Sequence, residues 1–129
     1  MRVYGLIMAG GSGERFWPVS LPGRPKQLLD LTGTGKTMLD QAIERLAPVA
    51  KDGIFCSTSL ALKQPIVDSG ILGEDKILAE PCKRNTLGAL VWSIGALAHK
   101  HGDLNFLAAV TTADHLIRPD SAFQETVSE

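Results

Sequence analysis

Short apolar runs alternate along the chain with segments of helical pattern, and this alternation restricts the fold more than any other feature of the sequence. Four mainly apolar runs are typical of buried strands, at 3–8, 53–57, 76–79 and 106–110. A segment that favours a helix follows each run, at 38–46, 60–68, 87–100 and 121–128. Strands that alternate with helices form parallel sheets through right-handed crossovers. The sequence therefore predicts an α/β fold, a Rossmann-like open parallel sheet with helices on both faces.

Two of the predicted helices have clear start signals. Thr37 can cap the helix over 38–46, and Asn85 or Thr86 can cap the helix over 87–100. Apolar residues occupy more than one face of the second helix, so we expect that helix to be well buried. The chain ends within the first turns of the last predicted helix, and we expect the fold to be incomplete within 1–129.

Composition excludes several classes of partner. The chain has 129 residues, 44% of them hydrophobic and 21% charged, which is ordinary for a globular domain. A net charge of -1 argues against binding to nucleic acid or to an anionic membrane. No apolar run approaches the roughly 18 residues of a transmembrane helix, and the first residues do not resemble a signal peptide. We therefore expect a cytoplasmic protein, in which Cys56 and Cys82 are reduced thiols without a function.

Polar clusters follow three of the four predicted strands, at 10–15, 80–86 and 114–115. In open parallel sheets, ligands bind beyond the carboxyl ends of the strands. The first cluster is rich in glycine, and glycines let backbone N–H groups approach a ligand closely and form a concavity for phosphate oxygens. Arg15 and Lys26 add positive charge near the loop. The sequence therefore predicts that the first cluster binds phosphate groups.

Two better-known phosphate motifs do not fit the sequence. The dinucleotide fingerprint G-x-G-x-x-G would begin at Gly11, but Phe16 stands where its last glycine is required. The segment 35–37 imitates the end of a P-loop, but Asp30 stands where the first glycine of that motif is required. We therefore interpret 33–36 as a polar turn.

The segment 10–20 reads GGSGERFWPVS, and PKQ follows at 25–27. Together they resemble the opening signature of one family, the mannose-1-phosphate guanylyltransferases. The tryptophan before the proline, the serine two residues after it and the PKQ are features of the guanylyl branch of the sugar nucleotidyltransferases. The EPCKRNT at 80–86 resembles the second signature, E-P-x-x-R-N-T, and the ADH at 113–115 resembles the third. The sequence departs from the family at 87–88, where Leu-Gly stands in place of the usual Ala-Pro.

The resemblance implies transfer of a guanylyl group from GTP to mannose 1-phosphate, giving GDP-mannose and pyrophosphate. It implies that Arg15 neutralises the departing pyrophosphate, that Lys26 contacts the α-phosphate or the sugar phosphate, and that Asp114 holds Mg²⁺. The residues expected to bind the nucleotide are Met8, Ala9, Gly10, Gly11, Ser12, Gly13, Glu80, Asn85 and Thr86. Residues 1–129 would then be the nucleotide-binding N-terminal part of a nucleotidyltransferase domain, with the sugar pocket and a second metal-binding carboxylate beyond residue 129.

Several alternatives stay open at this point. Another sugar-1-phosphate nucleotidyltransferase, using UTP or dTTP with heptose or glucose phosphates, would have the same fold. A non-catalytic nucleotide-binding module is an alternative of a different class. A further alternative is that the isolated 129-residue chain is inactive. Glu80 either selects the base or pairs with Lys83 or Arg84, while Phe16 and Trp17 are expected to pack beneath the loop rather than stack on the base. The oligomeric state is open, with a homo-oligomer as one alternative.

Overall fold

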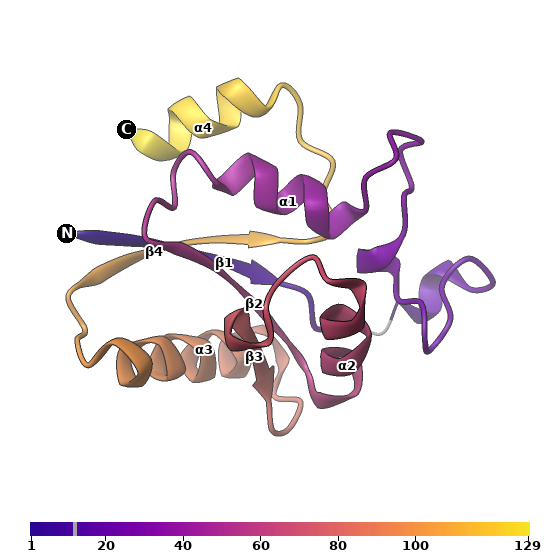
Figure 1. Ribbon diagram of the computed structural model, residues 1–129, viewed down its shortest axis with the longest axis horizontal. Coiled ribbons are helices and arrows are strands. Elements are labelled where there is room, and N and C mark those ends of the chain that lie inside the picture. The colour runs from indigo at the N-terminus through magenta and orange to yellow at the C-terminus, as the bar shows by residue number, and fades with distance from the viewer. Residues whose placement is uncertain (12) are drawn as a thin grey trace.

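The structure, a computed structural model, describes residues 1–11 and 13–129 (Figure 1). Within these residues, four parallel strands form one sheet in the order β3-β2-β1-β4. The strands are β1 (Arg2–Met8), β2 (Gly53–Ser59), β3 (Ile77–Glu80) and β4 (Phe106–Thr112). The helices are α1 (Met38–Leu46), α2 (Leu60–Ser69), α3 (Asn85–His101) and α4 (Asp120–Ser128). The predicted α/β fold with an open parallel sheet is confirmed.

Helices cover both faces of the sheet, as the sequence predicts. Figure 1 shows α1 and α4 on one side of the sheet and α3 on the other. On the first side, Leu39 and Leu46 of α1 and Ile66 of α2 pack against Ile7 of β1. On the second side, Leu97 of α3 packs in a separate cluster whose buried members are Tyr4, Leu6, Phe55, Leu78 and Leu97. Both faces of each inner strand are therefore apolar, which explains why the strands are continuous apolar runs in the sequence.

The strand β1 lies in the interior of the sheet, between β2 and β4. In the sheet register, Leu6 of β1 is paired with Phe55 of β2 on one side and with Val110 of β4 on the other. At the carboxyl end, Met8 is level with Ser57 and Thr112. The loop that follows β1 therefore emerges between the carboxyl ends of its two neighbours, which is where an open parallel sheet binds ligands.

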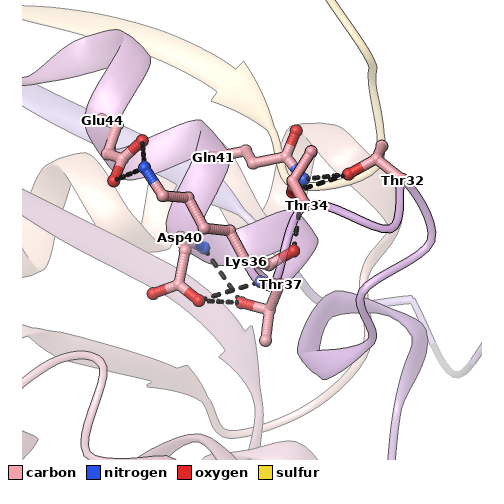
Figure 2. Close-up of polar contacts among 7 residues, drawn as sticks. All are labelled: Thr32, Thr34, Lys36, Thr37, Asp40, Gln41 and Glu44. Carbon is pink, nitrogen blue, oxygen red and sulfur yellow. Dashed lines mark hydrogen bonds and ion pairs between the residues drawn. The ribbon is translucent and has the colours of Figure 1, made fainter.

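The turn before α1 is held by side chains, and Figure 2 shows their contacts. The hydroxyl of Thr37 accepts from the Asp40 backbone N–H at 3.1 Å, and the Asp40 carboxylate accepts from the Thr37 N–H at 2.9 Å. Lys36 donates to both carboxylate oxygens of Glu44, at 2.7 and 2.8 Å. The predicted Thr37 cap is confirmed, because both bonds of a capping box are present. The segment 33–36 is a polar turn, as predicted, and its Lys36 pairs with Glu44 of α1.

Two predictions about α3 are wrong. The helix begins at Asn85 and its N-cap is Arg84, which makes no side-chain capping bond, so neither Asn85 nor Thr86 is the cap. Burial is also one-sided, since Leu87 is 73% exposed and Val91 is 65% exposed. The reason is that α3 packs on the sheet through one stripe of side chains along the helix. The sequence pattern indicates how apolar the helix is, but it does not indicate which elements lie next to it. Within the described part of the chain, no helix is both long and apolar enough to cross a membrane.

A buried arginine joins α1 to the segment after β4. The Arg45 side chain is 2% exposed, its Nε donates to Asp120 Oδ1 at 3.3 Å, and its Nη2 donates to the His115 carbonyl at 3.4 Å. The guanidinium also lies 5.8 Å from the centre of the Phe123 ring. Arg45 therefore fixes α4, and the loop that leads to it, against α1.

Candidate active site

A cavity of about 330 Å³ opens at the carboxyl edge of the sheet. It lies beyond the ends of β1, β3 and β4, at the position expected for a ligand in this topology. The residues that line it include most of the predicted site: Met8, Gly10, Gly11, Lys26, Glu80, Asn85, Thr86 and Asp114. The cavity thus brings together four parts of the chain that are far apart in the sequence.

Three described residues of the predicted site do not line the cavity. Ala9 is buried, and its carbonyl is a hydrogen-bond acceptor beneath the loop. Gly13, in the same loop, lies against the stem of Lys26 instead. Arg15 lies on a short 3-10 turn (Glu14–Phe16) with its side chain exposed. Ser12 lies outside the described residues. The roles assigned to these residues stay predictions.

The glycine loop packs closely on Lys26. Gly13 has a φ of 71°, a left-handed conformation that L side chains rarely adopt. A Cβ placed on Gly13 would lie 3.3 Å from Lys26 Cγ and 3.3 Å from Ser20 Oγ. Glycine is therefore needed at position 13 for both its conformation and its lack of a side chain.

Lys26 and Asp114 form an ion pair on the wall of the cavity. Lys26 Nζ lies 2.6 Å from Asp114 Oδ2, and the two side chains are 16% and 38% exposed. The hydrogen bond from Lys26 lowers the pKa of Asp114 below its usual value, although partial burial acts in the opposite direction. Asp114 is therefore an ionised carboxylate at neutral pH. Lys26 Nζ also lies 5.2 Å from the centre of the Phe16 ring, within range of a cation–π contact.

Glu80 supplies a second carboxylate at the far side of the cavity. It ends β3, is 9% exposed, and faces Gly10 so closely that a Cβ there would lie 3.4 Å from Glu80 Oε1. Among the described residues, no ion pair joins Glu80 to Lys83 or Arg84. An ionised carboxylate only accepts hydrogen bonds, so this end of the cavity suits a ligand that presents donors.

Ser57, in the last part of β2, supplies a hydroxyl to the cavity wall. Its Oγ lies 2.8 Å from Oγ of the buried Ser93, and the buried Thr58 donates from Oγ1 to the Ala9 carbonyl at 3.0 Å. The sequence analysis did not select these residues, because each lies in or beside an apolar run and its partner is distant in the sequence. It also did not select Gln27, Lys83 or Thr112, which line the cavity. Gln27 and Lys83 did carry a signal, because they lie in the PKQ and EPCKRNT segments.

The two aromatic residues of the loop are more exposed than expected. Phe16 is 43% exposed, and Trp17 is 75% exposed. The prediction that both pack beneath the loop is wrong, because both are exposed. Lys26 Nζ lies over the Phe16 ring, so Phe16 supports the ion pair rather than filling a core.

The comparisons with known proteins agree with this geometry. The model of the nucleotidyl transferase family matches residues 4–129. The chain is 36% identical to mannose-1-phosphate guanylyltransferase ManC of Salmonella typhimurium, over 98% of this chain and 27% of that protein. It is 35% identical to mannose-1-phosphate guanylyltransferase of Escherichia coli K12, again over 98% of this chain and 27% of the relative. The chain thus spans about a quarter of the length of these curated relatives.

A solved structure shares the fold. It is the crystal structure of a protein named mannose-1-phosphate geranyltransferase from Thermus thermophilus, with a TM-score of 0.81 and 36% sequence identity. The match covers 99% of this chain and 37% of that one. A family model that matches nearly the whole chain, together with a cavity at the carboxyl edge of the same sheet, identifies the chain as a member of the nucleotidyl transferase family.

Proposed function

We propose that the protein transfers a guanylyl group from GTP to mannose 1-phosphate, with 1–129 as the nucleotide-binding part of its catalytic domain. The observation that carries the proposal is that Gly10, Gly11, Lys26, Glu80 and Asp114 line the same cavity. The names of the relatives support this choice of base and sugar. The net charge of -1 fits a cytoplasmic enzyme with small-molecule partners rather than nucleic acid.

The phosphate groups of GTP would lie over the glycine loop. Gly10 and Gly11 carry no side chain that would keep the backbone from a phosphate, and Lys26 brings a positive charge to the same wall. Arg15 is exposed on the following turn, and we assign its guanidinium to the pyrophosphate. These groups supply positioning and charge neutralisation, which are the main requirements of such transfers.

The reaction needs no covalent intermediate on the protein. An oxygen of mannose 1-phosphate forms a bond to the α-phosphorus of GTP, the bond from that phosphorus to the bridging oxygen breaks, and pyrophosphate leaves with the bonding electrons. Negative charge gathers on the leaving group, where cationic groups lower the barrier. Lys26 and Arg15 are the cations of the described chain that we assign to this task.

The base would lie at the Glu80 end of the cavity. Guanine presents two adjacent donors on its Watson–Crick edge, and a carboxylate can accept from both. Thymine and uracil present one donor between two carbonyl oxygens, which a carboxylate repels. Because Glu80 is nearly buried, an unmatched carbonyl opposite it would be costly. Glu80 would therefore favour guanine.

Nucleotidyl transferases commonly use a divalent metal ion, and we propose Mg²⁺ for this protein. The described residues contain no group of three or more histidines, cysteines and carboxylates that could form a complete cage. Mg²⁺ does not need one, because it keeps several waters and takes one or two carboxylates together with substrate phosphates. The ionised Asp114 at the cavity wall fits this pattern once Lys26 has turned to a phosphate. The ion would neutralise phosphate charge there.

Release of pyrophosphate from GTP in the presence of mannose 1-phosphate tests the proposal. The full-length protein is assayed with GTP, UTP, dTTP and ATP against mannose, glucose and heptose 1-phosphates. We expect turnover to be fastest with GTP and mannose 1-phosphate. Faster turnover with another pair would assign the protein to a different sugar nucleotidyltransferase, and tight GTP binding without pyrophosphate release would assign it to the non-catalytic alternative.

A further inference from the structure

Gln27 is a polar side chain buried directly beneath the glycine loop. It lies on the short 3-10 turn Lys26–Leu28 and is 2% exposed. Its Nε2 donates one hydrogen bond to the Ala9 carbonyl at 3.1 Å and another to the Gly11 carbonyl at 2.9 Å. One amide group therefore connects two alternate peptide units of the loop that follows β1.

The chemistry of this contact requires glutamine. A carbonyl oxygen only accepts hydrogen bonds, so both bonds need the two hydrogens of a single NH₂ group. The reversed amide would place Oε1 against two carbonyl oxygens, and a glutamate would place a charge there. Gln27 Oε1 is buried without a hydrogen-bond partner in the described part of the chain. The side chain is therefore positioned for its two donors and not for its acceptor.

The two carbonyls depend on Gln27 to different extents. The Ala9 carbonyl also accepts from Thr58 Oγ1 at 3.0 Å, and the Ala9 N–H donates to the Ser57 carbonyl at 2.7 Å. Ala9 would stay in place if Gln27 were lost. Gly11 is exposed. Among the described residues, Gln27 is the side chain that donates a hydrogen bond to the Gly11 carbonyl. Gln27 is thus the contact that holds the first turn of the loop.

Fixing a carbonyl also fixes the direction of the N–H on the other side of the same peptide. In a trans peptide the C=O and N–H bonds point in opposite directions. The Ala9 carbonyl, held toward Gln27, therefore directs the Gly10 N–H away from Gln27. Lys26 precedes Gln27 on the same turn and reaches Asp114, so the turn places the loop backbone and the cation relative to each other.

We infer that Gln27 is a positioning residue, which sets the peptide orientation of the glycine loop for binding the phosphate groups of the nucleotide. The inference rests on the function proposed above. Gln27 stabilises a loop in which the donors already point at the ligand, so ordering of the loop does not oppose binding. A residue with only a structural role would affect the binding of every part of the nucleotide, whereas Gln27 would affect the binding of the phosphate groups alone.

The test compares the affinity for GTP with the affinity for guanosine, which lacks phosphate. Both are measured by calorimetry on the full-length protein without sugar phosphate. Gln27→Met keeps the length of the side chain and removes both donors, and Gln27→Glu adds a charge facing the carbonyls. We expect Gln27→Met to weaken GTP binding by on the order of tenfold to a hundredfold, with guanosine binding within about twofold of the wild type. Gln27→Glu should weaken GTP binding further.

Gln41 offers a matched control. Its Nε2 also makes two hydrogen bonds, to Thr32 Oγ1 and to the Lys36 carbonyl, but on the turn before α1 (Figure 2). Gln41→Met removes the same number of bonds away from the cavity and should leave both affinities unchanged. Thermal melts of each variant confirm that the folded protein is compared.

Three results would decide against the inference or the function. GTP affinity within about twofold of the wild type in folded Gln27→Met would overturn the inference. An equal loss of GTP and guanosine affinity would also overturn it, because the side chain would then act on the base or on the whole fold. A wild-type protein that binds GTP and releases no pyrophosphate would refute the proposed transfer alone, because the affinity ratio is measured without turnover.

Discussion

Replacing Lys26 should make the protein bind a divalent cation more tightly in the absence of nucleotide. Lys26 Nζ lies 2.6 Å from Asp114 Oδ2, in the position that a metal ion bound to this carboxylate would take. Each metal ion that binds there must first displace the ammonium group. Lys26→Met keeps much of the side-chain volume and removes the charge, so Asp114 becomes available to the cation.

The distance gives the size of the effect. Two unit charges 2.6 Å apart attract by about 1.6 kcal/mol at the dielectric constant of water. The aqueous value is appropriate, because Asp114 is 38% exposed and solvent screens the pair. The ordering of the Lys26 side chain removes part of this energy, which leaves about 1 kcal/mol. Cation affinity should therefore rise by about fivefold to tenfold.

Binding of Mn²⁺ to the full-length protein, followed by electron paramagnetic resonance, measures the change directly. Lys26→Arg keeps the charge and should leave the affinity near that of the wild type. Lys83→Met removes one positive charge from another part of the same cavity wall and should change the affinity by less than about twofold. The two controls separate release of Asp114 from a general change in the charge of the cavity.

An unchanged or weaker Mn²⁺ affinity in folded Lys26→Met would refute this reasoning. That result would mean that Asp114 binds no cation, or that Lys26 does not occupy its ligand position. A rise of similar size in Lys83→Met would refute it as well, because the effect would then come from the net charge of the cavity.

Four other predictions follow from the same geometry. Arg15→Ala should lower kcat/KM by on the order of a hundredfold with an unchanged melting temperature; near-normal activity would remove Arg15 from the reaction. Asp114→Asn should abolish turnover or raise the Mg²⁺ concentration needed for half-maximal rate, whereas an unchanged midpoint would make Asp114 a structural residue. Glu80→Gln should lower the selectivity for GTP over UTP by roughly ten- to a hundredfold; a competition assay with mixed nucleotides measures it, and an unchanged ratio would place base recognition elsewhere. Iodoacetamide should label the exposed Cys82 in the folded protein and leave Cys56 unlabelled, because burial raises the pKa of Cys56 to about 12; rapid labelling of Cys56 would contradict its burial.

The order of strands and helices could be predicted because each is a local pattern. Apolar runs give the strands, and a capping residue such as Thr37 gives the start of α1. Packing could not be predicted in the same way. Leu87 and Val91 look like core residues in the sequence, yet both are exposed, because burial depends on which elements lie opposite. The start of α3 was wrong for a related reason, since Asn85 adopts a left-handed conformation that no local pattern shows.

The candidate site was also predictable where local motifs define it and unpredictable where tertiary contacts do. Motifs with fixed spacing located the glycine loop, Glu80 and Asp114, and the structure brings all three to one cavity. The hydrogen bonds that hold these groups in place could not be predicted from the sequence. Gln27 and Arg45 are polar residues whose types suggest the surface, yet each is 2% exposed. Their partners lie on other segments of the chain, and only the tertiary fold brings donors and acceptors together.

The strand order also has a consequence for how the chain is made. β1 precedes its two partners, yet Tyr4 must align with Gly53 on one edge and with Ala108 on the other. During synthesis β2 and α1 can pack on β1 early, while the other edge of β1 stays unpaired until β4 has been made. At translation rates of roughly 5–20 residues per second, that edge stays open for several seconds. The nascent chain therefore carries an unpaired apolar strand for that time, and the loop that follows it is complete only when the second partner arrives.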